Sequence, residues 1–193
     1  MKKLTAIFLV SVFAVMCLLV PEASCAKKKS RAKKTQTPAK TQTTQTAKKP
    51  DSHGYYKNLT QEQAEAADKV AQKIAQTIMS DERLTTDLLR VRAAASVVMQ
   101  YCRRCLYGHD ETKYYKTPYG VFVAGIFTCA GATRALGLVL EFMGYEWQHI
   151  NANQWTHQWC ELTMDGKKGF ADGMGGFAGY GEYSTSNGFM LLR

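Results

Sequence analysis

Apolar residues recur at helical spacing in three stretches of the chain. The first covers residues 60–79 and opens with a capping box, in which Thr60 caps the helix and the Gln63 side chain reaches back to it. The second covers residues 85–105 and the third residues 129–143. The pattern predicts three helices, and we expect the first two to serve in packing, because their residues form no convincing catalytic pattern.

Downstream of the third helix, apolar and polar residues alternate as they do in half-buried strands. The alternation predicts strands at residues 145–151 and 157–164. The Asp165-Gly166 pair is a strong signal for a two-residue hairpin turn, so we expect residues 168–172 to return antiparallel to the preceding strand. The expected fold class is α+β, in which N-terminal helices and the third helix pack on a small antiparallel sheet.

Two stretches lack a periodic pattern. Residues 106–128 are punctuated by glycines and a proline and are expected to be irregular. Residues 173–188 are dense in glycine and tyrosine, which predicts a loop that leaves directly from the end of the last strand. Residues 188–192 are apolar enough for a closing strand.

The N-terminus has the composition of a secretion signal. Lys2 and Lys3 precede an apolar run at residues 4–20, and small residues follow at 24–26, so residues 1–26 are assigned to a signal peptide. An uncleaved membrane anchor is the alternative, and lipid modification of Cys25 is a less favoured one. In each case the protein is expected to be secreted or attached to the cell surface.

The positive charge is concentrated in one segment. Residues 27–50 hold nine Lys or Arg and no acid, whereas the chain from residue 51 onward has 14 basic and 15 acidic residues. The segment has no aromatic residue and no Val, Ile, Leu or Met, so burial cannot offset its ordering entropy and we expect disorder. Residues 27–58 are thus assigned to a disordered basic linker, and residues 59–193 to a single folded domain.

Three residues that together can form a nucleophilic site occur in the order Cys129, His157, Asp172. Cys129 begins the third predicted helix, where unpaired backbone N–H groups and the helix dipole favour a thiolate. The predicted hairpin brings the start of the strand at His157 close to the end of the strand at Asp172. Cysteine would then be the nucleophile, histidine the base and aspartate the group that orients the base.

This arrangement resembles the transglutaminase-like superfamily of papain-type enzymes, in which a cysteine on a helix is followed by a His-x-Trp strand and by an aspartate on the adjacent strand. The resemblance covers residues 84–172. Its matching positions are Cys129 with an Ala/Gly-rich helix, Gly144-Tyr145, His157-Gln158-Trp159, Asp165-Gly166-Lys167 and Phe170-Ala171-Asp172. It implies a papain-like core with a Cys-His-Asp triad, in a bacterial exported member of the superfamily.

The resemblance also implies an oxyanion hole. The backbone N–H of Cys129 is the expected first donor, because it lies at the start of the helix. The family takes its second donor from a side chain upstream of the nucleophile, a Trp in animal transglutaminases and a Gln in papain-like proteases. Neither stands at a fitting position in this chain, and Tyr119 is the candidate substitute. Trp159, close to His157, is expected to line the cleft and shield the ion pair from water.

Cys102, Cys105 and Cys160 remain besides the nucleophile and the two N-terminal cysteines. Residues 102–105 have the spacing of a redox or zinc motif, but a zinc site needs a second ligand pair and a thioredoxin-like motif follows a strand. Three interpretations stay open: the cysteines are packing thiols, two of them form a structural disulfide (a bond to Cys160 being one possibility), or they carry out redox chemistry. No metal or other cofactor is expected.

Two classes of function remain. The first is an exported cysteine-dependent enzyme that transfers an acyl group from a peptide or glutamine amide, either to water as a protease or amidase or to an amine as a transglutaminase. The second is a catalytically inactive domain of the same fold that binds or scaffolds at the cell surface. The expected partner is a protein or peptide substrate. Residues 27–50 are expected to bind an anionic wall polymer or membrane surface, or to act as a solvated spacer, and nucleic acid is not expected.

Overall fold

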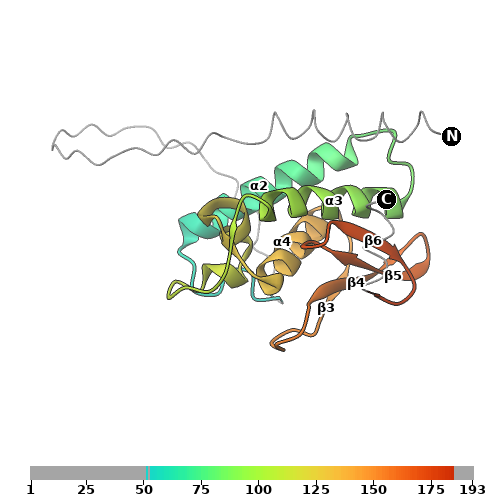
Figure 1. The fold of residues 1–193 in the computed structure, drawn as a ribbon. Coiled ribbons are helices and arrows are strands. Elements are labelled where there is room, and N and C mark those ends of the chain that lie inside the picture. Colours follow the sequence, from blue (N-terminus) through green and yellow to red (C-terminus); the bar gives the residue numbers. More distant parts are fainter. Residues whose placement is uncertain (1–50, 52, 185–193) are drawn as a thin grey trace, which may run out of the picture.

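The computed structural model describes residues 51 and 53–184, and its fold is drawn in Figure 1. In this part of the chain, three α-helices pack with a four-stranded antiparallel sheet, which makes the fold α+β. The expected signal peptide, the basic segment 27–50 and the expected closing strand at 188–192 lie outside the described residues. A search of the described helices for one long and apolar enough to cross a membrane finds none.

The three helices are α2 (Gln61–Met79), α3 (Asp87–Cys102) and α4 (Cys129–Phe142). The predicted capping box of α2 is confirmed, since Thr60 Oγ1 accepts the backbone N–H of Gln63 and the Gln63 side chain accepts that of Thr60. Helix α3 ends at Cys102, earlier than the predicted end at residue 105. The α-helical pattern ends there because the N–H groups of residues 104 and 105 bond to carbonyls three residues back, as in a 3₁₀ turn, and not four residues back.

Helix α4 is the central element of the fold (Figure 1). Ten of its 14 residues are buried, because it packs against α2 and α3 as well as against the sheet. Small residues allow this close packing. A Cβ at Gly131 would collide with the Tyr115 carbonyl, and one at Gly137 with the Trp147 indole. Helix α4, which begins at Cys129, is therefore held closely between the helical layer and the sheet.

The sheet is an antiparallel meander in the order β3 (Trp147–Ile150), β4 (Trp159–Met164), β5 (Lys167–Asp172) and β6 (Phe177–Tyr180). The β4–β5 turn is the predicted one, with φ of 51° at Asp165 and 73° at Gly166, as in a type I′ hairpin. Strand β6 lies in the stretch that was predicted to be a loop, and this part of the prediction is wrong. Its glycines weaken the strand signal, yet the strand pairs with β5 along its whole length and buries Phe177.

The connection between α3 and α4 contains short regular pieces within the stretch that was expected to be irregular. Strands β1 (Leu106–Tyr107) and β2 (Ile126–Phe127) form a parallel pair. Between them lie a 3₁₀ turn, η1 (Tyr114–Lys116), and a π-helical turn, η2 (Gly120–Ala124). The parallel pair leads the chain directly into the N-terminus of α4.

The ordered domain begins earlier than the boundary at residue 59 that was expected from the sequence. Tyr55 is only 2% exposed and belongs to the core. Its hydroxyl donates to Glu141 Oε1 (2.8 Å) and accepts from Trp147 Nε1 (3.0 Å). An aromatic side chain thus docks the end of the expected linker on α4 and β3, which corrects the domain boundary.

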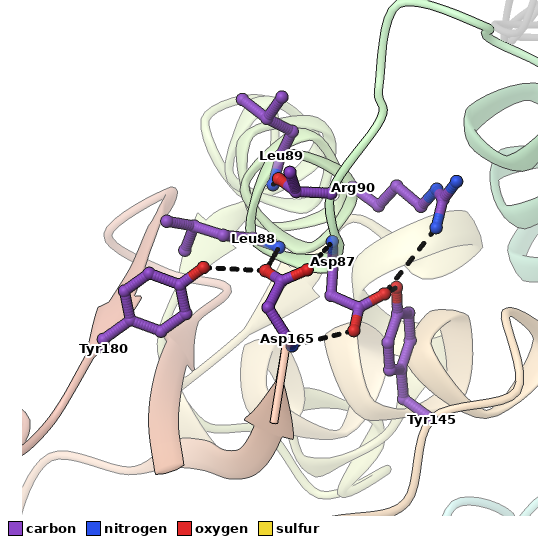
Figure 2. Close-up of polar contacts among 8 residues, drawn as sticks. Asp87, Leu88, Leu89, Arg90, Tyr145, Asp165 and Tyr180 are labelled. Atoms are coloured by element: carbon purple, nitrogen blue, oxygen red, sulfur yellow. Dashed lines mark hydrogen bonds and ion pairs between the residues drawn. The ribbon is translucent and has the colours of Figure 1, made fainter. Parts of the chain in front are cut away.

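The β4–β5 turn is joined to the start of α3 by reciprocal hydrogen bonds (Figure 2). The Asp165 carboxylate accepts the backbone N–H groups of Asp87 (2.9 Å) and Leu88 (3.1 Å), while Asp87 Oδ2 accepts the backbone N–H of Asp165 (2.9 Å). Tyr180 donates to Asp165 (2.7 Å) and Tyr145 to Asp87 (2.8 Å). We call this the Asp87–Asp165 contact. It fixes the hairpin relative to the helical layer.

Candidate active site

Cys129 is the first residue of α4, and it is partly exposed. The preceding Thr128 is the N-cap residue, but its hydroxyl donates to the Tyr115 carbonyl (3.2 Å) and does not cap the helix. The first N–H groups of α4 therefore have no side-chain cap, and the positive end of the helix lies at the thiol. The Cys129 Sγ is 3.9 Å from the carbonyl oxygen of Thr156.

The β4–β5 hairpin brings His157 to Asp172. His157 lies just before β4 and Asp172 ends β5, and the register pairs Cys160 with Ala171 next to them. His157 Nε2 lies 2.7 Å from Asp172 Oδ2. Asn151 Nδ2 donates to the His157 carbonyl (3.0 Å) and so holds the backbone at this point. The contact between histidine and acid follows from the hairpin that the sequence predicted.

Asp172 is almost completely buried, at 2% exposure, and each carboxylate oxygen accepts two hydrogen bonds. Oδ1 accepts the backbone N–H groups of Met174 and Gly175, both at 2.9 Å. Oδ2 accepts from His157 and from the Tyr183 hydroxyl (3.0 Å). These four donors compensate the buried charge and fix the orientation of the carboxylate.

Asp172 and Cys129 together raise the pKa of His157. The hydrogen bond with Asp172 is the larger cause and the one with Cys129 the second, and they outweigh partial burial to give a pKa of about 9. His157 is therefore an imidazolium at neutral pH. Because Nε2 faces Asp172, Nδ1 is the nitrogen left for the thiol.

Trp159 and Tyr119 were both expected to line the cleft. The Trp159 ring stacks on Tyr183, with centroids 4.3 Å apart, and its centroid is 6.4 Å from that of His157. The Tyr119 ring meets Tyr114 edge-on at 5.2 Å, just before η2. The structure thus brings Trp159 to the histidine side of the site and packs Tyr119 on Tyr114.

Two aromatic residues near the site were not assigned a role from the sequence. Tyr183 bonds to Asp172, and its only sequence signal was its place in the glycine- and tyrosine-rich stretch after the acid. Trp155 is 97% exposed and directly precedes Thr156, the residue that contacts the thiol. The ring of Trp155 lies 6.3 Å from that of His109. The polar connection therefore carries a large exposed indole on the residue that precedes Thr156.

The other three cysteines of the described chain are free thiols. Burial raises the pKa of Cys102, Cys105 and Cys160 above the ordinary value, so these sulfurs are protonated at neutral pH. Cys105 Sγ donates to the Tyr101 carbonyl (3.2 Å), as expected of a packing thiol. Among the described residues, no group of three or more His, Cys, Asp or Glu is arranged to hold a metal ion.

Comparisons with protein-family models, with curated proteins and with solved structures each returned no match to this chain.

Proposed function

We propose that this chain is an exported cysteine-dependent acyl-transfer enzyme of transglutaminase-like, papain-like fold, acting on peptide or glutamine amide bonds. The observation that carries the proposal is the contact of His157 with the buried Asp172 at 2.7 Å, in a site where Cys129 begins α4 and its sulfur lies 3.9 Å from the carbonyl oxygen of Thr156, the residue before His157. Nucleophile, base and orienting acid would then act together at the N-terminus of α4.

In the first half-reaction, the Cys129 thiolate attacks the carbonyl carbon of the amide and forms a C–S bond. The developing oxyanion accepts a hydrogen bond from the backbone N–H of Cys129 at the start of α4. The His157 imidazolium gives its proton to the leaving nitrogen as the C–N bond breaks. An amine leaves, and a thioester remains on the cysteine.

In the second half-reaction, neutral His157 removes a proton from the acyl acceptor, which attacks the thioester and releases the thiolate. Water as acceptor gives a carboxylic acid, and a primary amine gives a new amide. Asp172 keeps the imidazole oriented through both steps, because its carboxylate is itself held by two backbone N–H groups. Trp155, which is exposed and directly precedes the residue whose carbonyl lies 3.9 Å from the thiol sulfur, is a candidate to contact the substrate.

The competing proposal is a catalytically inactive binding or scaffolding domain at the cell surface. What favours it is that the chain has neither the Trp nor the Gln of the family at a fitting position upstream of Cys129, which leaves Tyr119 as the candidate second oxyanion donor. An oxyanion hole with a single backbone donor would be weaker by roughly 100- to 1,000-fold in turnover than one with two donors.

The deciding experiment is alkylation of the mature protein with iodoacetamide between pH 4 and pH 10, with the modified cysteines identified by peptide mapping. We expect Cys129 to react rapidly well below pH 8, and His157→Ala to restore the pH profile of an ordinary thiol. Cys105 serves as an internal reference, because burial raises its pKa and should keep it slow below pH 9.

An ordinary thiol profile for Cys129 in the unaltered protein would contradict the enzymatic proposal and favour the binding domain. If the thiol is activated, glutamine-containing peptides with and without a primary amine distinguish the acceptors. Release of ammonia with incorporation of the amine indicates transglutamination, and cleavage or deamidation alone indicates hydrolysis.

A further inference from the structure

Tyr183 shares an oxygen of the buried acid with the histidine. Its hydroxyl donates to Asp172 Oδ2 at 3.0 Å, the same atom that lies 2.7 Å from His157 Nε2. The other oxygen, Oδ1, is occupied by two backbone N–H groups. Among the described residues, His157 and Tyr183 are therefore the two side chains that hydrogen-bond to this carboxylate.

An aromatic cluster holds the Tyr183 ring in this position. The ring stacks on Trp159, with centroids 4.3 Å apart and planes 15° from parallel. Phe170 meets it edge-on at 5.4 Å, and Phe177 lies at 5.9 Å. Burial, with the nearby charge of Asp172, raises the pKa of the Tyr183 hydroxyl, so the group keeps its proton and remains a donor at neutral pH.

A second donor on Oδ2 has a predictable electrostatic effect. It draws negative charge away from the atom that accepts the histidine proton, so the carboxylate attracts the imidazolium less strongly than it would alone. A histidine that binds its proton too tightly is a poor acid toward a leaving amine, and one that binds it too weakly does not hold the thiolate. The hydroxyl therefore moderates the basicity of His157.

We propose that Tyr183 is a positioning residue of this site, which fixes Oδ2 of Asp172 toward His157 and moderates how tightly the imidazole binds its proton. The hydrogen-bonding part of this inference stands on the geometry alone. Only its catalytic consequence rests on the proposed function.

The test is the proton affinity of His157, followed by NMR titration of ¹⁵N-histidine-labelled mature protein, with His157→Gln used to assign its signal. Tyr183→Phe keeps the stacked ring and removes the donor, so we expect the affinity to rise roughly three- to tenfold. The matched control is Tyr180→Phe, which removes a 2.7 Å tyrosine–aspartate hydrogen bond to Asp165, away from the site. We expect it to leave His157 unchanged.

Two results would overturn the inference. One is a His157 titration in Tyr183→Phe that matches the unaltered protein. The other is an equal change in Tyr180→Phe, which would show a general response to a lost hydroxyl. Tyr183→Leu removes the stacked ring as well, so a titration disturbed in Tyr183→Leu but not in Tyr183→Phe would assign the residue to packing alone and reject the proposal.

The titration needs no turnover, so it separates this inference from the proposed function. With an amide substrate, Tyr183→Phe should lower kcat roughly three- to tenfold at unchanged KM, and it should move the alkaline limb of the pH profile to higher pH. A changed titration in a protein with no detectable activity would leave the hydrogen-bonding inference intact and contradict the enzymatic proposal alone.

Discussion

His157 binds its proton more tightly than a histidine in water, because its two polar neighbours raise its pKa from 6.5 to about 9. The raised pKa of His157 makes the free energy of unfolding depend on pH in a definite direction. A pKa that is raised in the folded state stabilises the fold fully below the unfolded value, and this stabilisation is lost as the pH rises through the folded value. The protein should therefore lose free energy of unfolding between about pH 6.5 and pH 9.

Replacing Asp172 with Asn should lower the pKa of His157, because it removes the largest cause of the shift. We expect the pH profile of Cys129 alkylation to move toward that of an ordinary thiol, with a rate at pH 6 about tenfold lower, because a less basic His157 pairs less well with a thiolate. Asparagine also leaves donors around the former carboxylate unpaired, which should cost about 1–3 kcal/mol in the free energy of unfolding. Iodoacetamide alkylation across pH measures the first effect, and denaturant titrations at pH 6 and pH 9 measure the second.

The exposed Asp110 supplies the control for this substitution, since Asp110→Asn removes a carboxylate that accepts only from its neighbours Thr112 and Lys113. Its alkylation profile should match that of the unaltered protein. An Asp172→Asn profile equal to the unaltered one would show that the carboxylate does not set the proton affinity of His157.

Trp155 should contribute to substrate binding and not to stability, because it is 97% exposed and lies next to the residue that contacts the thiol. We expect Trp155→Ala to raise KM about tenfold, with kcat nearly unchanged and the free energy of unfolding within about 0.5 kcal/mol. Met79→Ala, which truncates an exposed apolar side chain at the end of α2, is the control. A KM that does not change in Trp155→Ala would exclude the indole from the substrate site.

At the scale of elements, the Asp87–Asp165 contact sets how the hairpin meets the helices (Figure 2). The Tyr180 hydroxyl and the backbone N–H groups at the start of α3 hold the pKa of Asp165 below its usual value. The corresponding stabilisation is present above the unfolded pKa, near 3.8, and is lost as the pH falls through the lower, folded value.

Asp165→Asn tests this contact without disturbing the turn, because Asn-Gly also favours a type I′ hairpin. We expect the Tm at pH 7 to fall by several degrees, since one acceptor oxygen and the charge at the N-terminus of α3 are lost. The difference should shrink below about pH 4, where the aspartate itself becomes protonated. Thermal scans of the unaltered protein and of Asp165→Asn between low pH and pH 7 measure the difference in Tm. A Tm difference that does not change with pH would assign the loss of stability to the turn and not to the charged contact.

At the scale of the whole molecule, charge and chemistry occupy different parts of the chain. The basic segment 27–50 carries nine cationic residues and no acid, while the triad belongs to the folded domain. We propose that this segment holds the protein against an anionic wall polymer or membrane. The alternative remains a solvated spacer.

Deletion of residues 27–50 should abolish sedimentation of the mature protein with anionic vesicles or purified wall polymer, and the binding of the full-length mature chain should weaken steeply as salt is raised. Alkylation of Cys129 should be unaffected in the deletion variant, which provides the control that the domain is intact. Equal sedimentation with and without the segment would favour the spacer.

The sequence by itself determined the elements whose signals are local. The capping box at Thr60 and the type I′ turn at Asp165-Gly166 depend on residues within four positions of one another, and both are present as predicted. The hairpin then brought His157 near Asp172, and the two side chains are in contact. Burial of α4 on nearly all sides likewise follows from its almost continuous apolar sequence.

Only the tertiary structure decided the contacts between groups that are distant along the chain. Asp165 caps α3 from 78 residues away, and Tyr55 reaches Glu141 across 86 residues. Tyr183 meets Asp172 because β6 turns back along β5, a pairing that the glycine-rich sequence did not reveal. Such contacts depend on how separate elements pack, and packing leaves no periodic signal in either partner alone.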